Sequence, residues 1–197
     1  MGARALAPGK KNARRRNAWL IFLDESGISL LPVVRRTWAP RGKTPVITHH
    51  FNWKRLSIAG SLAYHSRRRR ARLYLHMHPG AYNDLALIEV IQQLRIELRG
   101  ERATLLWDGL SGHWSGCMRA FLATQRSWLV VERLPAYAPE LNPVESLWAQ
   151  LKGHHLANCG WETIEEVASA TAGGIAEIRR SQQLLFSFIH KAGLPLQ

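Results

Sequence analysis

The sequence predicts an α/β fold in which a mixed sheet is flanked by helices. Two short apolar runs, Ala18–Leu23 (AWLIFL) and Ala103–Trp107 (ATLLW), have the length and the flanking turn residues of buried strands. Asn83–Leu98 has apolar residues at helical spacing, with Asn83 as a cap and Gly100 as a stop. Strands that alternate with helices in this way favour a sheet with helices on its faces.

Composition and charge narrow the class of protein. The chain of 197 residues is long enough for one domain with a sizeable core. No apolar run approaches the roughly 20 residues of a membrane span, and we see no signal peptide, so we expect a cytoplasmic protein without a membrane partner. Cys117 and Cys159 form no metal-binding motif and fit a reducing compartment. The net charge of +13 predicts a polyanionic partner, although an Arg-rich coding bias also contributes.

The first 17 residues are expected to form a unit of their own. Residues 1–17 combine clustered Lys and Arg with Gly and Pro and little apolar pattern, which predicts a flexible basic arm. Such an arm could lie on DNA phosphates or be the remnant of a linker. Residues 18–197 are expected to form a single domain with a helical C-terminal part, in Glu162–Ile178 and Gln182–Ile189.

Two aspartates each follow an apolar run. Asp24 follows the first run, and the Asp-Glu-Ser-Gly stretch is expected to turn the chain back into a second strand at Ile28–Val33. Neighbouring strand residues point to opposite faces, so only one of Asp24 and Glu25 can face a site. Asp108 repeats the layout after Ala103–Trp107. If the two strands are parallel neighbours, the aspartates lie side by side at the sheet's carboxyl edge; otherwise each simply caps a turn.

Two basic stretches lie between these aspartates. The first is a loop in which four cations surround Trp38, suited either to phosphate and base contacts or to a surface loop with Trp38 in the core. Its cations are Arg35, Arg36, Arg41 and Lys43. The second is an arginine turn between the strands expected at Trp53–Tyr64 and Ala71–His76, where DNA contact and plain solvation are both open. It consists of Arg67, Arg68, Arg69 and Arg70.

A third carboxylate comes from the stretch Leu134–Lys152, LPAYAPELNPVESLWAQLK. Its prolines hold the first half extended, and Asn142 followed by Pro143 is a strong helix start. Glu145 lies in the first turn, where the helix dipole favours a negative charge. The alternative is a capped surface helix with an ordinary first-turn Glu.

PAYAPELNPVESLWAQLK closely resembles the third catalytic block of bacterial insertion-sequence transposases in the mariner-like DDE superfamily. The resemblance extends from Trp19 to about Leu156. It implies a ribonuclease H-like fold with a mixed five-stranded sheet flanked by helices, and a catalytic, metal-binding triad of Asp24, Asp108 and Glu145. The interval from Asp108 to Glu145 is slightly longer than is usual in the family, which fits a longer loop before Glu145.

The resemblance also implies a chemistry. Carboxylate oxygens suit Mg²⁺ or Mn²⁺, and two such ions can activate an attacking oxygen and stabilise a leaving one. The implied reactions are metal-dependent strand cleavage and strand transfer at insertion-sequence ends. His113 occupies the place of a recurrent family histidine and could orient a phosphate or water, or simply pack beside Trp114. Lys152, two helical turns after Glu145, could contact phosphate or be solvated.

The partner implied is double-stranded DNA, as transposon ends and target, in a nucleoid-associated protein. We expect no helix-turn-helix before residue 18, so DNA recognition would come from a separate partner or an upstream reading frame. A homodimer is left open. Two rival functions also stay open: a non-catalytic DNA-binding remnant of a transposase, and a nuclease of the same fold without strand transfer.

Overall fold

The structure, a computed structural model, describes residues 7–49, 54–135 and 138–194. Its centre is a five-stranded sheet in the order β3-β2-β1-β4-β5. The strands are β1 (Trp19–Ser29), β2 (Arg55–His65), β3 (Ala71–His78), β4 (Ala103–Trp107) and β5 (Leu129–Arg133). The helices are α2 (Ala7–Arg16), α3 (Asp84–Glu97), α4 (Gly116–Thr124), α5 (Pro143–Gln150), α6 (Ile164–Arg180) and α7 (Gln182–Lys191). Short turns are η1 (Ser111–Trp114), η2 (Pro139–Leu141) and the π-helical η3 (Leu151–His155).

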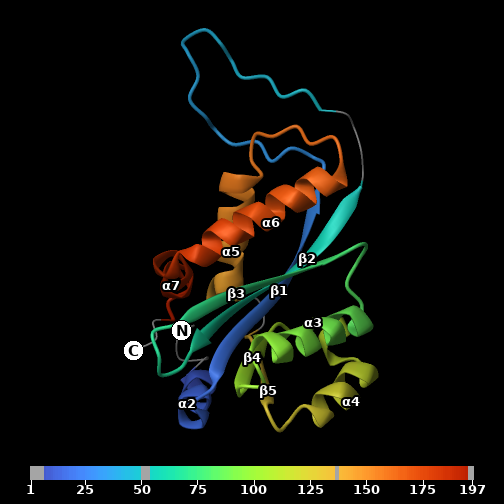
Figure 1. The fold of residues 1–197 in the computed structure, drawn as a ribbon, viewed down its shortest axis with the longest axis vertical. Helices are drawn as coiled ribbons and strands as arrows, with labels where there is room; N and C mark the ends of the chain where they lie inside the picture. Colours follow the sequence, from blue (N-terminus) through green and yellow to red (C-terminus); the bar gives the residue numbers. More distant parts are fainter. Residues whose placement is uncertain (1–6, 50–53, 136–137, 195–197) are drawn as a thin grey trace.

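Strand β1 separates two hydrophobic cores, because successive side chains of a strand point to opposite faces. Leu20 and Phe22 pack in the core covered by α5, α6 and α7. Trp19, Ile21 and Leu23 pack in the core covered by α3 and α4. The two helical layers lie on either side of the strands (Figure 1). A strand that is buried on both faces needs a continuous apolar run, which explains the sequence AWLIFL.

Strand β1 continues beyond the point where the sequence suggested a turn. It pairs antiparallel with β2 from Trp19↔His65 to Ser29↔Arg55, so the Asp-Glu-Ser-Gly stretch is extended strand. The expected hairpin into a strand at Ile28–Val33 is wrong. The polar stretch stays extended because β2 supplies its backbone partners, and Ile28 is buried beyond it.

The strands pair in parallel on one side of β1 and antiparallel on the other, so the predicted mixed sheet is confirmed. Strand β1 is parallel to β4, with Phe22 opposite Leu106, and β4 is parallel to β5. Strands β2 and β3 form an antiparallel hairpin whose turn carries Arg67, Arg68, Arg69 and Arg70, as predicted. Asp24 of β1 and Asp108, which directly follows β4, therefore come from neighbouring parallel strands.

The helix starts predicted from the sequence are also confirmed. The side chain of Asn83 accepts a hydrogen bond from the Ala86 amide at the start of α3. A capping box of Thr163 and Glu166 begins α6. Within the described part of the chain, no helix combines the length and the apolar character needed to cross a membrane.

The segment expected to be a flexible arm contains a packed helix, α2. Ala13 is fully buried against the sheet, and the Arg16 guanidinium donates to the carbonyl oxygens of Ala103 and Trp128. Asn12 donates to the Glu132 carboxylate. These contacts are tertiary and rest on one small apolar residue, so the sequence pattern alone does not reveal the helix. Residues 1–6 of the expected arm lie outside the described residues.

The long connection between β1 and β2 projects beyond the sheet (Figure 1). Its base is docked on the segment after η3: Val33 bridges to Ala157, and the Arg35 amide donates to Asn158 Oδ1 at 2.8 Å. Trp38 is 100% exposed, which excludes the interpretation that it packs in the core. Residues 50–53 of the connection lie outside the described residues.

Helix α5 lies across the sheet because β2 has no side chain at Gly60. A Cβ built on Gly60 would lie 2.5 Å from Trp148 Cη2 and 2.9 Å from its Cζ2. The indole of Trp148 therefore occupies the space that a larger residue would fill. This close approach brings α5, and with it Glu145, over the central strands.

Gly60→Ala is therefore expected to lower the free energy of unfolding by about 1–3 kcal/mol, because it overpacks a filled site against a large ring. Denaturant unfolding measures the change. Gly27→Ala in β1 is the matched control, since a Cβ there meets nothing within 4 Å, and it should change stability by less than about 0.5 kcal/mol. Equal decreases in the two variants would contradict this account of Gly60.

Candidate active site

The three predicted carboxylates line one pocket of about 600 Å³. Asp24 comes from β1, Asp108 from the end of β4, and Glu145 from the first turn of α5. Arg133 and residues of the proline-containing segment between β5 and α5, which we call the proline loop, also line the pocket. The pocket thus lies at the carboxyl edge of the two parallel strands, where open α/β sheets place their sites.

The register of β1 and β4 sets the two aspartates level with each other. Phe22 lies opposite Leu106, and each aspartate follows two residues later, Asp24 within β1 and Asp108 directly after the end of β4. Asp24 lies in the middle of β1 rather than at its end. Because β4 stops at Trp107, no residue of β4 pairs with the backbone of Asp24. The parallel pairing on which the predicted side-by-side arrangement depends is confirmed.

Asp24 is the most buried of the three acids. Trp148 Nε1 donates to Asp24 Oδ2 at 2.8 Å, so the helix that carries Glu145 also orients Asp24. Burial raises the pKa of Asp24 to about 7, against the opposing effect of the Trp148 hydrogen bond. The negative charges of Glu145, Glu25 and Asp108 contribute to the same rise, in smaller measure than burial. The cluster is therefore under electrostatic strain that a cation would relieve.

Asp108 is held by its own turn. Its Oδ1 accepts a hydrogen bond from the Leu110 amide at 3.0 Å, and its carbonyl oxygen accepts from Trp114 Nε1 at 3.1 Å. The side chain is 37% exposed, so the carboxylate remains accessible from the pocket. The turn after β4 thus fixes the backbone while leaving the acid open.

Glu145 is exposed on the pocket wall at the start of α5. The Asn142 side chain accepts from the Val144 amide, and Pro143 occupies the first turn, as the sequence predicted. The first turn of a helix favours a carboxylate through its dipole. The proline loop and this cap place Glu145 on the rim facing the two aspartates.

These oxygen ligands suit a hard divalent cation such as Mg²⁺ or Mn²⁺. In the described part of the chain, however, no three His, Cys, Asp or Glu side chains lie close enough to form a ready-made metal site. The three acids surround the pocket without converging on one point. The donor set therefore fits a divalent cation in its chemistry, and an ion would have to draw the carboxylates together.

A family model for DDE superfamily endonucleases matches residues 19–168, most of the chain and all three acids. This chain belongs to the DDE superfamily. Among curated proteins, no sequence matches it.

Solved structures show the same fold. The Mos1 strand transfer complex aligns with a TM-score of 0.64 and 20% identity, over 98% of this chain and 59% of that chain. The Mos1 paired end complex with Mn gives 0.63 and 21%, over 98% and 60%. The catalytic domain of Mos1 mariner transposase gives 0.57 and 18%, over 98% and 90%. The predicted ribonuclease H-like fold is confirmed, and the DDE chain spans about 59% of the chain in the strand transfer complex.

Glu25 points away from the pocket lining and pairs with His113. His113 is buried, with Nε2 3.1 Å from Glu25 Oε2 and Nδ1 2.6 Å from Asp108 Oδ1. Its ring stacks on Trp107 with centroids 3.9 Å apart. Burial lowers the pKa of His113, but the hydrogen bond and charge of Glu25 and the charge of Asp108 outweigh it and raise the pKa overall. This geometry favours orientation of Asp108 over direct contact with DNA.

Lys152 reaches the same region from η3. Its Nζ donates to Ser26 Oγ at 2.7 Å, two residues along β1 from Asp24. Burial lowers the pKa of Lys152, while Glu145 and Asp24 act in the opposite direction. The side chain is half-buried beside the acids, so it is not the freely solvated lysine that the sequence left open.

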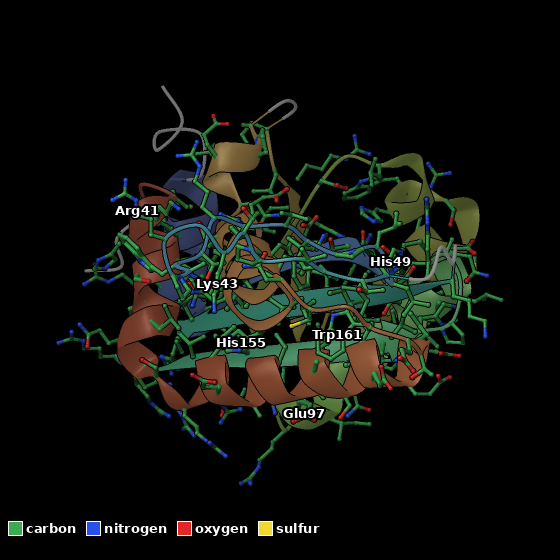
Figure 2. The ribbon with its side chains drawn as sticks, turned by 90° about the horizontal axis from the view of Figure 1, so that it is seen from above. Arg41, Lys43, His49, Glu97, His155 and Trp161 are labelled. Carbon is green, nitrogen blue, oxygen red and sulfur yellow. The ribbon has the colours of Figure 1, made fainter. Side chains whose placement is uncertain are left out.

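The other predicted DNA-binding residues lie elsewhere. Arg35 packs its guanidinium against Gly153 at the base of the long connection. Arg36, Arg41 and Lys43 are exposed along that connection, where Figure 2 labels Arg41 and Lys43. The arginine turn lies between β2 and β3, at the opposite end of the sheet. Neither group lines the pocket that holds the carboxylates.

Arg133, which the sequence analysis did not single out, does line this pocket. It ends β5 opposite Trp107, and its guanidinium lies 4.0 Å from the ring centroid of Trp114. The signal available in the sequence was a cation at the last position of a strand, directly before the proline loop. Arg133 lies at the pocket because β5 pairs with β4, and the sequence alone does not show this pairing.

Asp24→Asn is expected to stabilise the metal-free DDE domain at pH 8. Because the folded-state pKa of Asp24 is raised to about 7, the wild type loses stability as pH rises from about 4 to about 7. The variant should avoid this loss, which is on the order of 2–4 kcal/mol. Denaturant unfolding at pH 4, 6 and 8 without divalent cations measures it.

Glu89→Gln on the exposed face of α3 is the matched control, and its difference from wild type should not vary in this way. A difference between Asp24→Asn and wild type that is the same at pH 4 and pH 8 would contradict the burial of a strained carboxylate.

Proposed function

We propose that this DDE domain is the catalytic part of a bacterial insertion-sequence transposase that cleaves DNA at transposon ends and joins the freed 3′-hydroxyl to target DNA. One observation carries the proposal: Asp24, Asp108 and Glu145, from three distant parts of the chain, line one open pocket. Membership of the DDE superfamily and the fold likeness to Mos1 complexes support the same class of reaction.

Asp24 and Asp108 are proposed to hold divalent cations, and Glu145 to complete the site. Bound Mg²⁺ or Mn²⁺, as two ions, would activate the attacking oxygen and stabilise the leaving oxygen of the phosphodiester. Paired end complexes of Mos1 have been crystallised with each of these metals. In this chain, burial and, less strongly, the neighbouring acids raise the pKa of Asp24, and a cation would lower this pKa because its positive charge stabilises the carboxylate.

Residues around the acids would position them and the DNA. Trp148 donates a hydrogen bond to one oxygen of Asp24, and the His113 ring lies between the carboxylates of Asp108 and Glu25 and contacts both. Arg133 lines the pocket, and Lys152 lies beside Ser26 of β1, close enough to interact with Glu145 and Asp24; both cations are suited to the phosphates that flank the scissile one. The exposed cations of the long connection are proposed to contact DNA beyond the pocket.

Recognition of the transposon ends is proposed to come from outside this DDE domain, through a helix-turn-helix partner or an upstream reading frame. The fold likeness is consistent with this, because the chain aligns with 59% of the chain in the strand transfer complex. A homodimer and a nucleoid-associated, cytoplasmic location complete the proposal.

The deciding experiment is nicking of supercoiled plasmid with Mg²⁺ or Mn²⁺, comparing wild type with Asp108→Asn. Wild type is expected to nick, and the variant to lose activity by at least about 100-fold, since a metal ligand is removed. As a readout independent of activity, Mn²⁺ should raise the melting temperature of wild type more than that of the variant.

Equal nicking by the two proteins would overturn the site. DNA binding without nicking would favour a non-catalytic remnant, and nicking without joining of a pre-cut end to target DNA would favour a nuclease of this fold.

Arg133→Gln is expected to raise KM for plasmid about fivefold with little change in kcat. The reason is that an exposed cation holding a flanking phosphate stabilises the bound substrate and the transition state equally, by about 1 kcal/mol. Arg119→Gln, an exposed arginine of α4 outside the pocket, is the control and should leave both constants unchanged. An unchanged KM for Arg133→Gln would remove it from the proposed site.

A further inference from the structure

Six arginines meet at the end of the sheet opposite the carboxylates. Two belong to the last turn of α2 and four to the turn between β2 and β3. We call this surface the basic end, and it consists of Arg14, Arg15, Arg67, Arg68, Arg69 and Arg70. The two segments are far apart in sequence, so only the fold brings them together.

Hydrogen bonds join the two parts of the basic end. Ser66 Oγ donates to the Ala13 carbonyl oxygen at 3.2 Å, and Arg67 Nε donates to the Arg14 carbonyl oxygen at 3.0 Å. His65 Nδ1 accepts from the amides of Arg67 and Arg68. The arginine turn is therefore fixed at its base by its own backbone and by α2.

The basic end carries its positive charge without acidic partners. All six arginine side chains are exposed, and within the described residues none of them forms an ion pair. Burial and the nearby positive charge of Arg68 lower the pKa of the adjacent His65, against the opposing effect of Glu101. Like charges held together in this way repel one another, and a polyanion would relieve the repulsion.

The basic end is also concave. Arg67, Arg68 and Arg69 line one side of a pocket of about 330 Å³, and Phe186 and His190 of α7 line the other. None of the large exposed apolar side chains in the described residues belongs to this surface. Interfaces between proteins normally contain an apolar or aromatic core, so the surface suits a phosphate backbone better than a protein partner.

The basic end is remote from the catalytic pocket. Trp19 lies opposite His65 at the hairpin turn, whereas Asp24 lies opposite Gly60. The five residue steps from Trp19 to Asp24 span about 16 Å of strand. That distance exceeds the screening length of about 8 Å at physiological ionic strength. The basic end therefore does not neutralise the phosphate that is cleaved.

We propose that the basic end binds the phosphate backbone of a duplex DNA segment other than the one held at the carboxylates. The inference rests on the proposed function in that the polyanion is DNA. It assigns the arginine turn and α2 to one site, and it gives this DDE domain two separate surfaces for DNA.

The test is the salt dependence of binding to a 30-base-pair duplex, followed by fluorescence anisotropy without divalent cations. The variant Arg68→Gln/Arg69→Gln/Arg70→Gln should lower the slope of log Kd against log salt by about 0.9 for each phosphate that the variant no longer neutralises, or about 2–3 in all. Arg68→Lys/Arg69→Lys/Arg70→Lys is the matched control and should keep the wild-type slope.

Two further variants test separate parts of the proposal: that α2 belongs to the surface, and that this surface is distinct from the catalytic pocket. Arg14→Gln/Arg15→Gln should also lower the slope, and a wild-type slope there would overturn the joint surface. Adding Arg133→Gln to the Gln triple variant should lower the slope further, and no further change would overturn the separation of the two surfaces. An unchanged slope in the Gln triple variant would overturn the whole proposal.

The salt slope is measured without divalent cations and without cleavage, so it tests the basic end separately from the catalytic acids. The basic end can thus stand even if Asp108→Asn nicks DNA as wild type does, in which case only the proposed function fails.

Discussion

The parallel pairing of β1 with β4 is the constraint on which the site depends. It fixes Phe22 opposite Leu106, and so sets Asp24 and Asp108 level at the edge of the sheet. Everything else at the site is arranged around that edge: α5 brings Glu145 over it, and the turn after β4 holds Asp108 open to the pocket. A slip of one residue in the register would reverse which face each acid occupies, so the packing of two cores on β1 also protects the site.

The elements with strong local signals could be predicted from the sequence. The apolar run of β1, the Asn142 cap of α5 and the capping box of α6 each depend on residues close together in the chain. These signals, with the resemblance of the third block, were enough to predict the mixed sheet and to single out three acids that line one pocket. Their side-by-side placement depended on assuming that β1 and β4 are parallel neighbours, which no local pattern states.

The parts that could not be predicted depend on partners distant in sequence. Helix α2 forms because Arg16 and Asn12 find acceptors on β4, β5 and their flanks, and its own residues give little reason for it. The Asp-Glu-Ser-Gly stretch looks like a turn locally, yet pairing with β2 keeps it extended. Arg133 acquires its place only when β5 joins β4, and His113 only when Glu25 comes within reach of its ring.

Charge is distributed unevenly along β1. One end of this strand begins beside a group of exposed arginines, and further along it carries acids that repel one another. A long polyanion that diffuses toward such a molecule is attracted more strongly to the arginines than to the acids. If the proposed function holds, first contact with DNA and cleavage are separate events in time, and the orientation of the molecule is decided before any cation binds at the acids.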